Sequence, residues 1–189
     1  MPALCWHGGW LAAARVRPSP NRNVRPAGSV VDLVIVHSIS LPPGQYGGDE
    51  VERFFTNRLD PAAHPYFGTI RDLRVSAHFF VRRDGALVQF VSTDERAWHA
   101  GRSSFGGRAD CNDFSIGIEL EGLEGEGFEP AQYAGLGALL QALSQRHPLR
   151  CVAGHQHVAP GRKADPGPGF DWPLARRAAA GLALAWPDE

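Results

Sequence analysis

The chain has 189 residues, of which 43% are hydrophobic, and a formal net charge of −1. This length is enough for one compact domain with a real core, so a single domain over residues 1–189 is expected. The near-neutral charge and the lack of a lysine- or arginine-rich block argue against a protein that binds nucleic acid or an anionic membrane by neutralising phosphates.

The first regular element in chain order is a buried strand. It follows a loop at residues 17–28 that is rich in glycine and proline. Residues 33–36 form a continuous apolar run, which is typical of a strand covered on both faces. His37 then lies at the carboxyl end of this strand, where ligands tend to gather.

A short helix and a hairpin are predicted next. After a loop at residues 41–48, residues 49–57 place three apolar side chains on one helical face, with Asp49 as the N-cap. Two apolar runs, at residues 78–83 and 86–91, predict an antiparallel hairpin. The dipeptide Asp84-Gly85 between them favours a type I′ turn.

Residues 115–121 alternate strictly between apolar and other residues, which predicts a strand. Gly117, Glu119 and Glu121 then share one face. A glycine beside a carboxylate is expected to leave open space for an approaching ligand. Without further information, either glutamate on this face could act as a base.

Two helices complete the predicted elements. Residues 131–146 carry apolar side chains at helical spacing after Pro130, which suits the first turn. A last helix is expected from Trp172 to about Leu184. Because strands and helices intermingle and one hairpin is local, we predict an α/β fold with a central mixed β-sheet flanked by helices.

The composition also bears on the compartment. No apolar stretch reaches the length of about 20 residues that a membrane helix needs, and the first ten residues lack a basic segment followed by an apolar one. A cytoplasmic protein is therefore expected. The cysteines at positions 5, 111 and 151 form no C-x-x-C pair, so unreactive thiols are expected rather than disulfides or a cysteine zinc site.

A candidate zinc site is formed by His37 and residues near the carboxyl end of the chain. A structural zinc site usually has four protein ligands, whereas a hydrolytic site has three and leaves a position for water. Two histidines with Asp165 fit the hydrolytic pattern. His155 and His157 are equally good candidates for the second histidine, because both would point the same way in an extended segment. Lys163 should point the same way as Asp165, two residues further on.

The chain resembles the AmpD-type N-acetylmuramoyl-L-alanine amidases of cell-wall recycling from about Trp10 to Trp172. The resemblance rests on a series of ordered segments rather than on one motif. These segments are residues 17–20, 36–44, 60–65, 73–78, 96–101, 111–122 and 154–168.

The resemblance implies a zinc amidase that cuts the amide between 1,6-anhydro-N-acetylmuramic acid and the L-alanine of the stem peptide, in cytoplasmic muropeptide recycling. Its substrate would be a small soluble anhydro-muropeptide, and the protein a monomer. In hosts with an inducible β-lactamase, the activity would keep induction low.

The resemblance also implies roles for eight residues, by matching positions. The zinc ligands would be His37, His155 and Asp165. The catalytic residues would be Glu119 and Lys163. The sugar or the peptide would be contacted by Arg74, Trp98 and Arg162. Four other histidines, His64, His78, His99 and His157, are expected in the core, in hydrogen bonds or facing the substrate, and not as ligands.

The chemistry of amide hydrolysis suits these residue types. Zinc lowers the pKa of bound water to about 7 and polarises a carbonyl. Glu119 would accept the proton of the water and pass it to the leaving amine, and Lys163 would stabilise the oxyanion. Arg74 and Arg162 suit the carboxylates of the stem peptide, and Trp98 suits a sugar face.

Two positions depart from the family pattern. Ser38 replaces an asparagine, and Asp110 stands where a basic residue is usual, so substrate affinity or stem-peptide preference need not follow that of the family, whereas the zinc chemistry is expected to be kept. Two alternative functions share parts of this pattern. One is a lytic amidase that acts on intact peptidoglycan. The other is a non-catalytic peptidoglycan-recognition module, against which the complete set of ligands and Glu119 argues.

Overall fold

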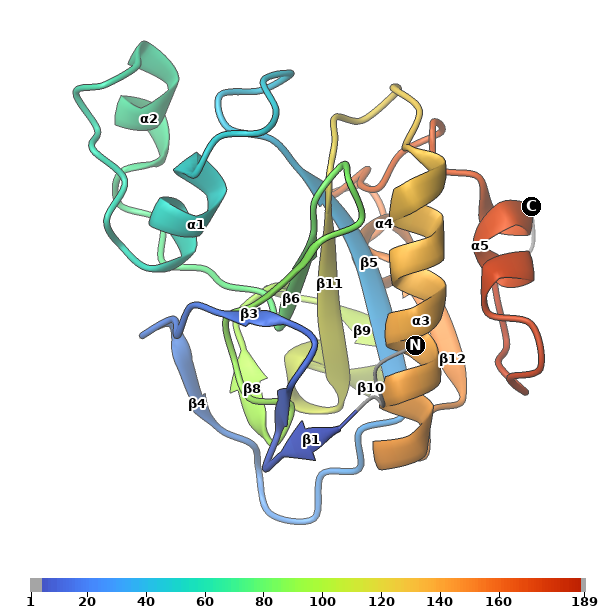
Figure 1. Cartoon of the computed structure of the whole chain (residues 1–189). Coiled ribbons are helices and arrows are strands. Elements are labelled where there is room, and N and C mark those ends of the chain that lie inside the picture. The colour runs from blue at the N-terminus through green and yellow to red at the C-terminus, as the bar shows by residue number, and fades with distance from the viewer. Residues whose placement is uncertain (1–4, 188–189) are drawn as a thin grey trace.

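A six-stranded mixed sheet forms the centre of the protein in the computed structural model, which describes residues 5–187 (Figure 1). The strand order is β12-β5-β11-β6-β7-β3. The first four strands are parallel to one another, β7 is antiparallel to β6, and β3 is parallel to β7. The strands are β3 (Arg15–Val16), β5 (Leu33–Ile39), β6 (Phe79–Val81), β7 (Leu87–Gln89), β11 (Ser115–Glu121) and β12 (Cys151–Gly154).

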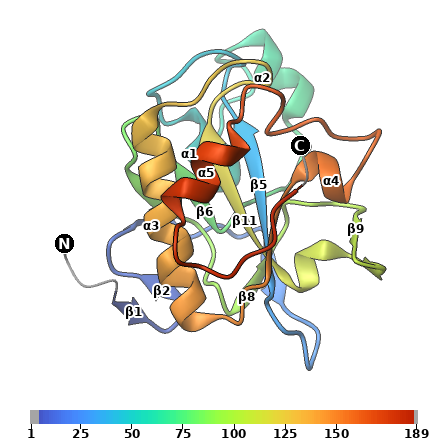
Figure 2. The same cartoon turned by 90° about the vertical axis from the view of Figure 1, so that its right-hand side faces the viewer.

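Helices lie on both sides of this sheet. The long helix α3 (Pro130–Arg146) covers one face, with α5 (Trp172–Ala178) beside it (Figure 2). Helices α1 (Glu50–Phe55) and α2 (Pro65–Ile70) lie away from α3, towards the carboxyl ends of β5 and β11 (Figure 1). The predicted α/β fold, with a central mixed sheet flanked by helices, is confirmed.

The remaining elements are short. Three two-stranded sheets pair β1 with β2, β4 with β8 and β9 with β10. Their bounds are β1 (Trp6–His7), β2 (Trp10–Leu11), β4 (Arg22–Val24), β8 (Glu95–Ala97), β9 (Ser104–Phe105) and β10 (Arg108–Ala109), and a 3-10 helix (Cys111–Asp113) and α4 (His155–Val158) complete the set. Within residues 5–187, no helix is both long and apolar enough to cross a membrane.

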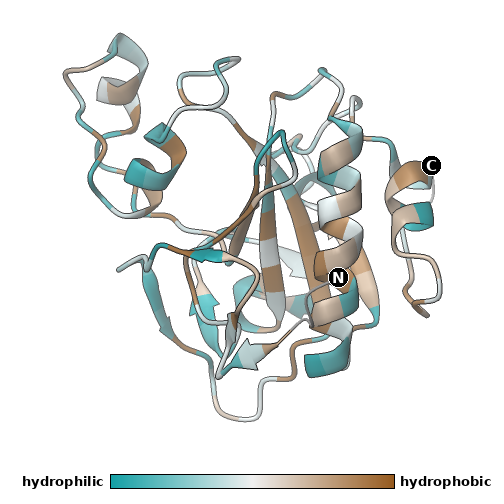
Figure 3. Ribbon diagram, in the orientation of Figure 1, coloured by the Kyte–Doolittle hydropathy of each residue, from teal (hydrophilic) through white to brown (hydrophobic). Residues whose placement is uncertain are grey.

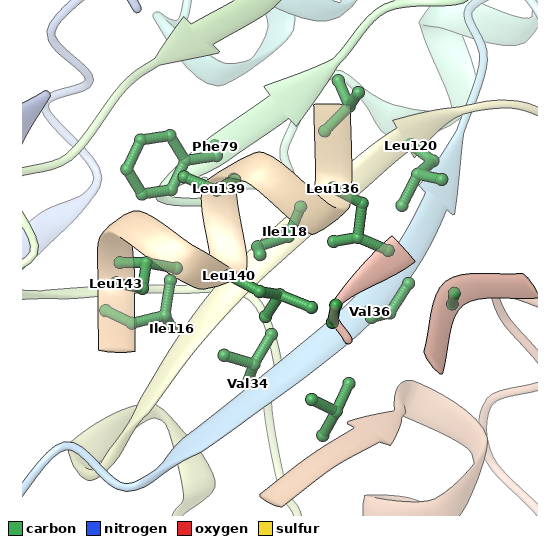
Figure 4. Close-up of a cluster of buried hydrophobic side chains, with 14 of the residues drawn as sticks. Val34, Val36, Phe79, Ile116, Ile118, Leu120, Leu136, Leu139, Leu140 and Leu143 are labelled. Atoms are coloured by element: carbon green, nitrogen blue, oxygen red, sulfur yellow. The ribbon is translucent and has the colours of Figure 1, made fainter. Parts of the chain in front are cut away.

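The main core lies between the sheet and α3 (Figure 4). Alternate residues of the two central strands point towards this helix, and the residues at these positions are apolar. The strands accordingly carry hydrophobic colour in the middle of the molecule (Figure 3). Full burial of each such side chain stabilises the fold by about 1.5–3 kcal/mol. The labelled members are Val34, Val36, Phe79, Ile116, Ile118, Leu120, Leu136, Leu139, Leu140 and Leu143. The opposite face of β5 and β11 is thereby left for the functional site.

The strand predictions are confirmed in their positions. The buried strand at 33–36 continues to Ile39, so His37 lies within β5. All residues of β11 are buried, because both faces of this central strand are covered. The hairpin of β6 and β7 is present, but the predicted type I′ turn is wrong. Gly85 has a φ of +83° while Asp84 has no positive φ, and Gly85 N–H donates to Arg82 O at 2.8 Å, which gives a three-residue loop.

The helix predictions hold with changes at their ends. Helix α1 ends at Phe55, and Asp49 stands at its N-cap without a capping hydrogen bond, because its carboxylate pairs with Arg53. Helix α3 begins at Pro130. Helix α5 ends at Ala178 rather than near residue 184. The chain turns after the helix, at Gly181, which has a φ of +89°.

Candidate active site

Three buried groups from separate parts of the chain converge at the carboxyl end of β5. The Nδ1 atoms of His37 and His155 lie 3.0 Å apart, and each lies 3.0 Å from Oδ2 of Asp165. Parallel pairing of β5 and β12 explains why the two histidines are close together. Gly154 of β12 pairs with Val36 of β5, so the residues that follow them, His155 and His37, lie side by side. The predicted set of two histidines and Asp165 therefore forms one cluster, and all three residues are buried.

This cluster has the chemistry of a zinc site. Two imidazole nitrogens and one carboxylate oxygen are ligands that zinc takes in hydrolytic sites. Ligands at about 2.0–2.1 Å from a tetrahedral zinc ion are about 3.3 Å apart, close to the 3.0 Å between each pair of these atoms. Three ligands also leave a position for water. The ligand types and the spacing of these three side chains therefore fit a zinc ion.

Hydrogen bonding aims Nδ1 of His155 into the cluster. Its other ring nitrogen, Nε2, lies 3.1 Å from the carbonyl oxygen of Ala100. Because a carbonyl oxygen only accepts, Nε2 must carry the proton, and the neutral ring then has its lone pair on Nδ1. The same carbonyl accepts a hydrogen bond from Nη2 of Arg162 at 2.6 Å.

His157 does not share this position. Residues 155–157 are not extended but belong to the short helix α4 (His155–Val158). Two residues in a helix are rotated by about 200° from each other, so the two imidazoles point apart. His157 Nδ1 instead accepts from Gly154 N–H at 2.8 Å, and its ring packs against Trp172. Of the two histidines, His155 is the one in the cluster.

The electrostatics of the cluster suit metal ligands. Burial lowers the pKa of His37 to about 4, although its hydrogen bond with Asp165 opposes this shift. Burial alone would raise the pKa of Asp165, but hydrogen bonds with His155 and His37 hold it well below its ordinary value. At neutral pH the carboxylate is therefore charged and His37 is neutral, the protonation states that ligands need.

Glu119 lies beside the cluster, because it is the register partner of His37. On β11 it pairs with His37 of the parallel strand β5. Its Oε2 atom is buried and has no hydrogen-bond partner within the described chain. Burial raises the pKa of Glu119 well above its ordinary value, the charge of Asp165 adds to this, and Lys163 opposes it.

Glu121 is engaged elsewhere, which separates the two glutamates that share a strand face. One of its oxygens accepts from Gly47 N–H at 2.6 Å and the other from Arg83 N–H at 3.1 Å. Both contacts tie loops to the sheet. Glu119, with a free oxygen, is the group available for proton transfer.

A cavity of about 560 Å³ opens over the cluster, which is within the size range of small-ligand sites. Its polar end holds the three clustered residues together with Glu119 and Lys163. Lys163 and Asp165 thus face the same cavity, as their spacing predicts. The apolar wall comes mainly from the region of α1 and α2 and includes Leu41, Phe54, Ile70 and Leu73.

The three predicted substrate contacts lie outside this cavity and are hydrogen-bonded within the protein. Arg74 donates to the carbonyl oxygens of residues 71 and 73, and Trp98 Nε1 donates to Asn23 Oδ1 at 2.6 Å. Arg162 Nη2 donates to the carbonyl oxygens of residues 100 and 102. Each nevertheless adjoins in sequence a residue that lines the cavity. Their roles remain predictions.

The two positions that depart from the family pattern differ in location. Ser38 lines the cavity, and its buried hydroxyl has no hydrogen-bond partner within the described chain. Asp110 instead precedes the 3-10 helix, with a φ of +56° in the left-handed region.

His99 is the residue whose place the sequence did not reveal. The expectation of open space above Gly117 is wrong, because the imidazole of His99 fills it. A Cβ atom on Gly117 would lie 2.4 Å from Cγ of His99. His99 Nδ1 lies 3.0 Å from Nε2 of His37, and burial lowers the pKa of His99 well below its ordinary value. The missing side chain at position 117 was the available signal.

Comparison with known proteins gives consistent matches. A family model described as N-acetylmuramoyl-L-alanine amidase matches residues 27–168. The 1,6-anhydro-N-acetylmuramyl-L-alanine amidase AmpD of Citrobacter freundii is 54% identical over 166 residues, which cover 87% of this chain and 89% of the relative. AmpD of Escherichia coli is 52% identical over 166 residues, covering 87% of this chain and 91% of that relative.

Solved structures agree with these sequence matches. The crystal structure of a selenomethionine AmpD derivative superposes with a TM-score of 0.89 at 51% identity, covering 92% of this chain and 98% of that chain. A second structure is that of AmiD from E. coli in complex with the substrate anhydro-N-acetylmuramic acid-L-Ala-D-gamma-Glu-L-Lys. It superposes with a TM-score of 0.59 at 27% identity, covering 87% of this chain and 63% of that chain.

Proposed function

The chain belongs to the N-acetylmuramoyl-L-alanine amidase family, and from this premise we propose that it hydrolyses the amide between 1,6-anhydro-N-acetylmuramic acid and the L-alanine of a stem peptide. The observation that carries the proposal is the cluster of His37, His155 and Asp165 beside a free carboxylate of Glu119 in one cavity. Relatives at 52–54% identity that carry this activity in their names cover 87% of the chain and support the choice of substrate.

The cofactor of this proposal is zinc, held by Nδ1 of His37, Nδ1 of His155 and Oδ2 of Asp165. When bound there, zinc would supply a water of lowered pKa and would polarise the scissile carbonyl. The three residues contribute one negative charge in a buried place, so they keep part of the ion's positive charge available for this chemistry.

Glu119 moves the proton in this reaction. Its free oxygen accepts a proton from the attacking water as the C–O bond forms at the carbonyl carbon. It then gives this proton to the nitrogen of L-alanine as the C–N bond breaks, so the peptide leaves with a neutral amine. Burial, which raises the pKa of Glu119, favours the first step, because a carboxylate of ordinary pKa holds a proton too weakly to take it from water.

Lys163 stabilises the charge that develops on the carbonyl oxygen. Its side chain faces the same cavity as Glu119 and Asp165. An ammonium group placed near a developing oxyanion lowers the barrier most where water is partly excluded. The apolar wall of the cavity supplies that exclusion and binds the apolar parts of the substrate.

The rest of the substrate would extend over the margin of the cavity, towards Arg74, Trp98 and Arg162. These residues adjoin Leu73, His99 and Lys163, which line it. The arginines suit the carboxylates of the stem peptide and the tryptophan suits the sugar. We propose that the protein acts on a small muropeptide as a single-domain monomer, in cytoplasmic muropeptide recycling.

The test compares two substrates with three preparations of the protein. Anhydro-muramyl tripeptide and intact peptidoglycan are each incubated with the zinc-loaded protein, with a chelated sample and with a chelated sample restored with zinc, and the products are identified by mass. Zinc-restorable release of free tripeptide from the small substrate alone is expected. Equal cleavage of intact peptidoglycan would instead indicate a lytic amidase. Binding of the muropeptide without cleavage would refute the enzyme and leave a recognition module.

A further inference from the structure

His99 lies on the far side of His37 from the proposed zinc site. It follows β8 and is buried against Gly117 of β11, with 9% of its surface exposed. Its Nδ1 lies 3.0 Å from Nε2 of His37, and its Nε2 lies 3.3 Å from the hydroxyl of Ser115. His37 thus stands between the cluster and a second imidazole.

The proton positions in this chain of groups follow from Ser115. Its hydroxyl donates its one proton to the carbonyl oxygen of Cys111, at 2.6 Å. Towards His99 the hydroxyl oxygen can therefore only accept, so Nε2 of His99 carries a proton. In a neutral His99 ring, Nδ1 is then an acceptor, and it takes the proton of His37 Nε2. The neutral His37 ring is left with a lone pair on Nδ1, which faces the cluster.

The residue after His99 serves the second histidine in the same way. The Ala100 carbonyl accepts from Nε2 of His155, which frees the lone pair of that ring on Nδ1. Asn112 holds both residues, because its Oδ1 accepts from the backbone N–H of His99 at 3.2 Å and of Ala100 at 2.8 Å. One two-residue segment therefore orients both imidazole ligands.

We propose that His99 is a positioning residue, which fixes His37 in the tautomer that can bind zinc, while Ser115 sets the tautomer of His99. The Ala100 carbonyl does the same for His155. A ring with its proton on Nδ1 presents no lone pair to the ion, so the wrong tautomer removes a ligand. Hydrogen-bond partners of metal-binding histidines contribute about 10–100-fold to metal affinity in general. The inference rests on the proposed zinc site.

A pair of matched substitutions separates the acceptor from the packing of His99. H99N keeps an oxygen near the place of Nδ1, whereas H99L fills similar space with no acceptor. Zinc dissociation constants are measured by competition with a chromophoric chelator, and the His37 tautomer in the metal-free protein by long-range ¹H–¹⁵N spectra. We expect H99L to weaken zinc binding about 10–100-fold and to populate the Nδ1–H form of His37, and H99N to lose less than about tenfold.

S115A provides a second test that leaves the volume of His99 unchanged. It removes the acceptor for His99 Nε2–H, so the Nδ1–H tautomer of His99 should become populated and zinc affinity should fall. Circular dichroism with chelator present checks the fold of each variant. If H99L does not fold, the result for S115A is the deciding test.

Equal losses in H99N and H99L would overturn the inference, as would S115A with wild-type tautomers and affinity. If the wild-type protein itself did not bind zinc, the proposed site would fail instead.

Discussion

The two glutamates of β11 should separate activity from stability. Both are buried on one face of the strand, two residues apart, so E119Q and E121Q are matched substitutions. Glu119 has a free oxygen over the cavity, whereas both oxygens of Glu121 accept backbone hydrogen bonds. We expect E119Q to lose activity and E121Q to lose stability.

The magnitude for E119Q follows from the loss of proton transfer. General acid–base catalysis contributes about 10²–10⁴-fold, so kcat/KM should fall by that factor, equivalent to about 2.7–5.5 kcal/mol in the barrier. Stability should not fall. Burial raises the pKa of Glu119, which means that the folded state disfavours the carboxylate, and a neutral amide removes that cost.

The magnitude for E121Q follows from its two hydrogen bonds. An amide keeps one acceptor oxygen but turns an NH₂ group towards the other backbone N–H, so one charge-assisted bond is lost. Such a bond contributes about 1.5–3 kcal/mol. This corresponds to a fall of about 1 M in the urea midpoint. The rate per folded molecule should remain close to that of the wild type.

The assay combines initial rates on anhydro-muramyl tripeptide with urea unfolding of the chelated proteins. Rates are expressed per folded molecule, so that loss of stability is not counted as loss of chemistry. The assignment of Glu119 fails if E119Q keeps wild-type kcat/KM, or if E121Q lowers it as much.

Three further predictions concern the oxyanion, the metal and the pH. K163A should lower kcat about 10²–10³-fold, because the ammonium group acts on the transition state. The urea midpoint should not change, because the side chain is exposed. An unchanged kcat in a steady-state assay would show that Lys163 does not stabilise the oxyanion. Zinc at 100 times its dissociation constant should stabilise the wild type by about 2.7 kcal/mol in urea unfolding. H157A should keep this gain and H155A should lose it, and the reverse pattern would exchange the two histidines. The metal-free protein should lose stability as the pH falls from about 6.5 towards 4, because the unfolded state then binds protons that five histidines of lowered pKa do not bind in the folded state, each by up to about 1.4 kcal/mol per pH unit. Glu119, with its raised pKa, acts in the opposite direction but is one group against five, so urea midpoints that rise on acidification would contradict these pKa shifts. The five histidines are His37, His78, His99, His147 and His157.

The central strands and the helix α3 could be predicted because burial leaves a periodic mark on the sequence. The alternation at 115–121 reflects a side-chain environment that repeats every two residues, and the continuous apolar run at 33–36 reflects a strand that is covered on both faces. The position of His37 near a strand end follows from the same pattern. Choosing His155 over His157 needed the family resemblance, because periodicity could not show that α4 turns the two rings apart.

The surroundings of the cluster could not be predicted, because they depend on pairing between distant segments. His99 reaches His37 only because the segment after β8 packs against β11, where His99 contacts Ser115, 16 residues later in the chain. Gly117 looked like an opening for a ligand, and only the folded chain shows that an imidazole occupies it. The short paired strands, such as β4 with β8, have too few residues for a recognisable period.

The most direct measurement is an anomalous difference map at the zinc absorption edge, from crystals of the zinc-loaded protein. We expect one strong peak within bonding distance of His37 Nδ1, His155 Nδ1 and Asp165 Oδ2, about 2.0–2.2 Å from each. Loss of this peak in D165A crystals would agree with this expectation. A peak at other residues, or no peak in an active crystal form, would contradict the proposed centre of the reaction.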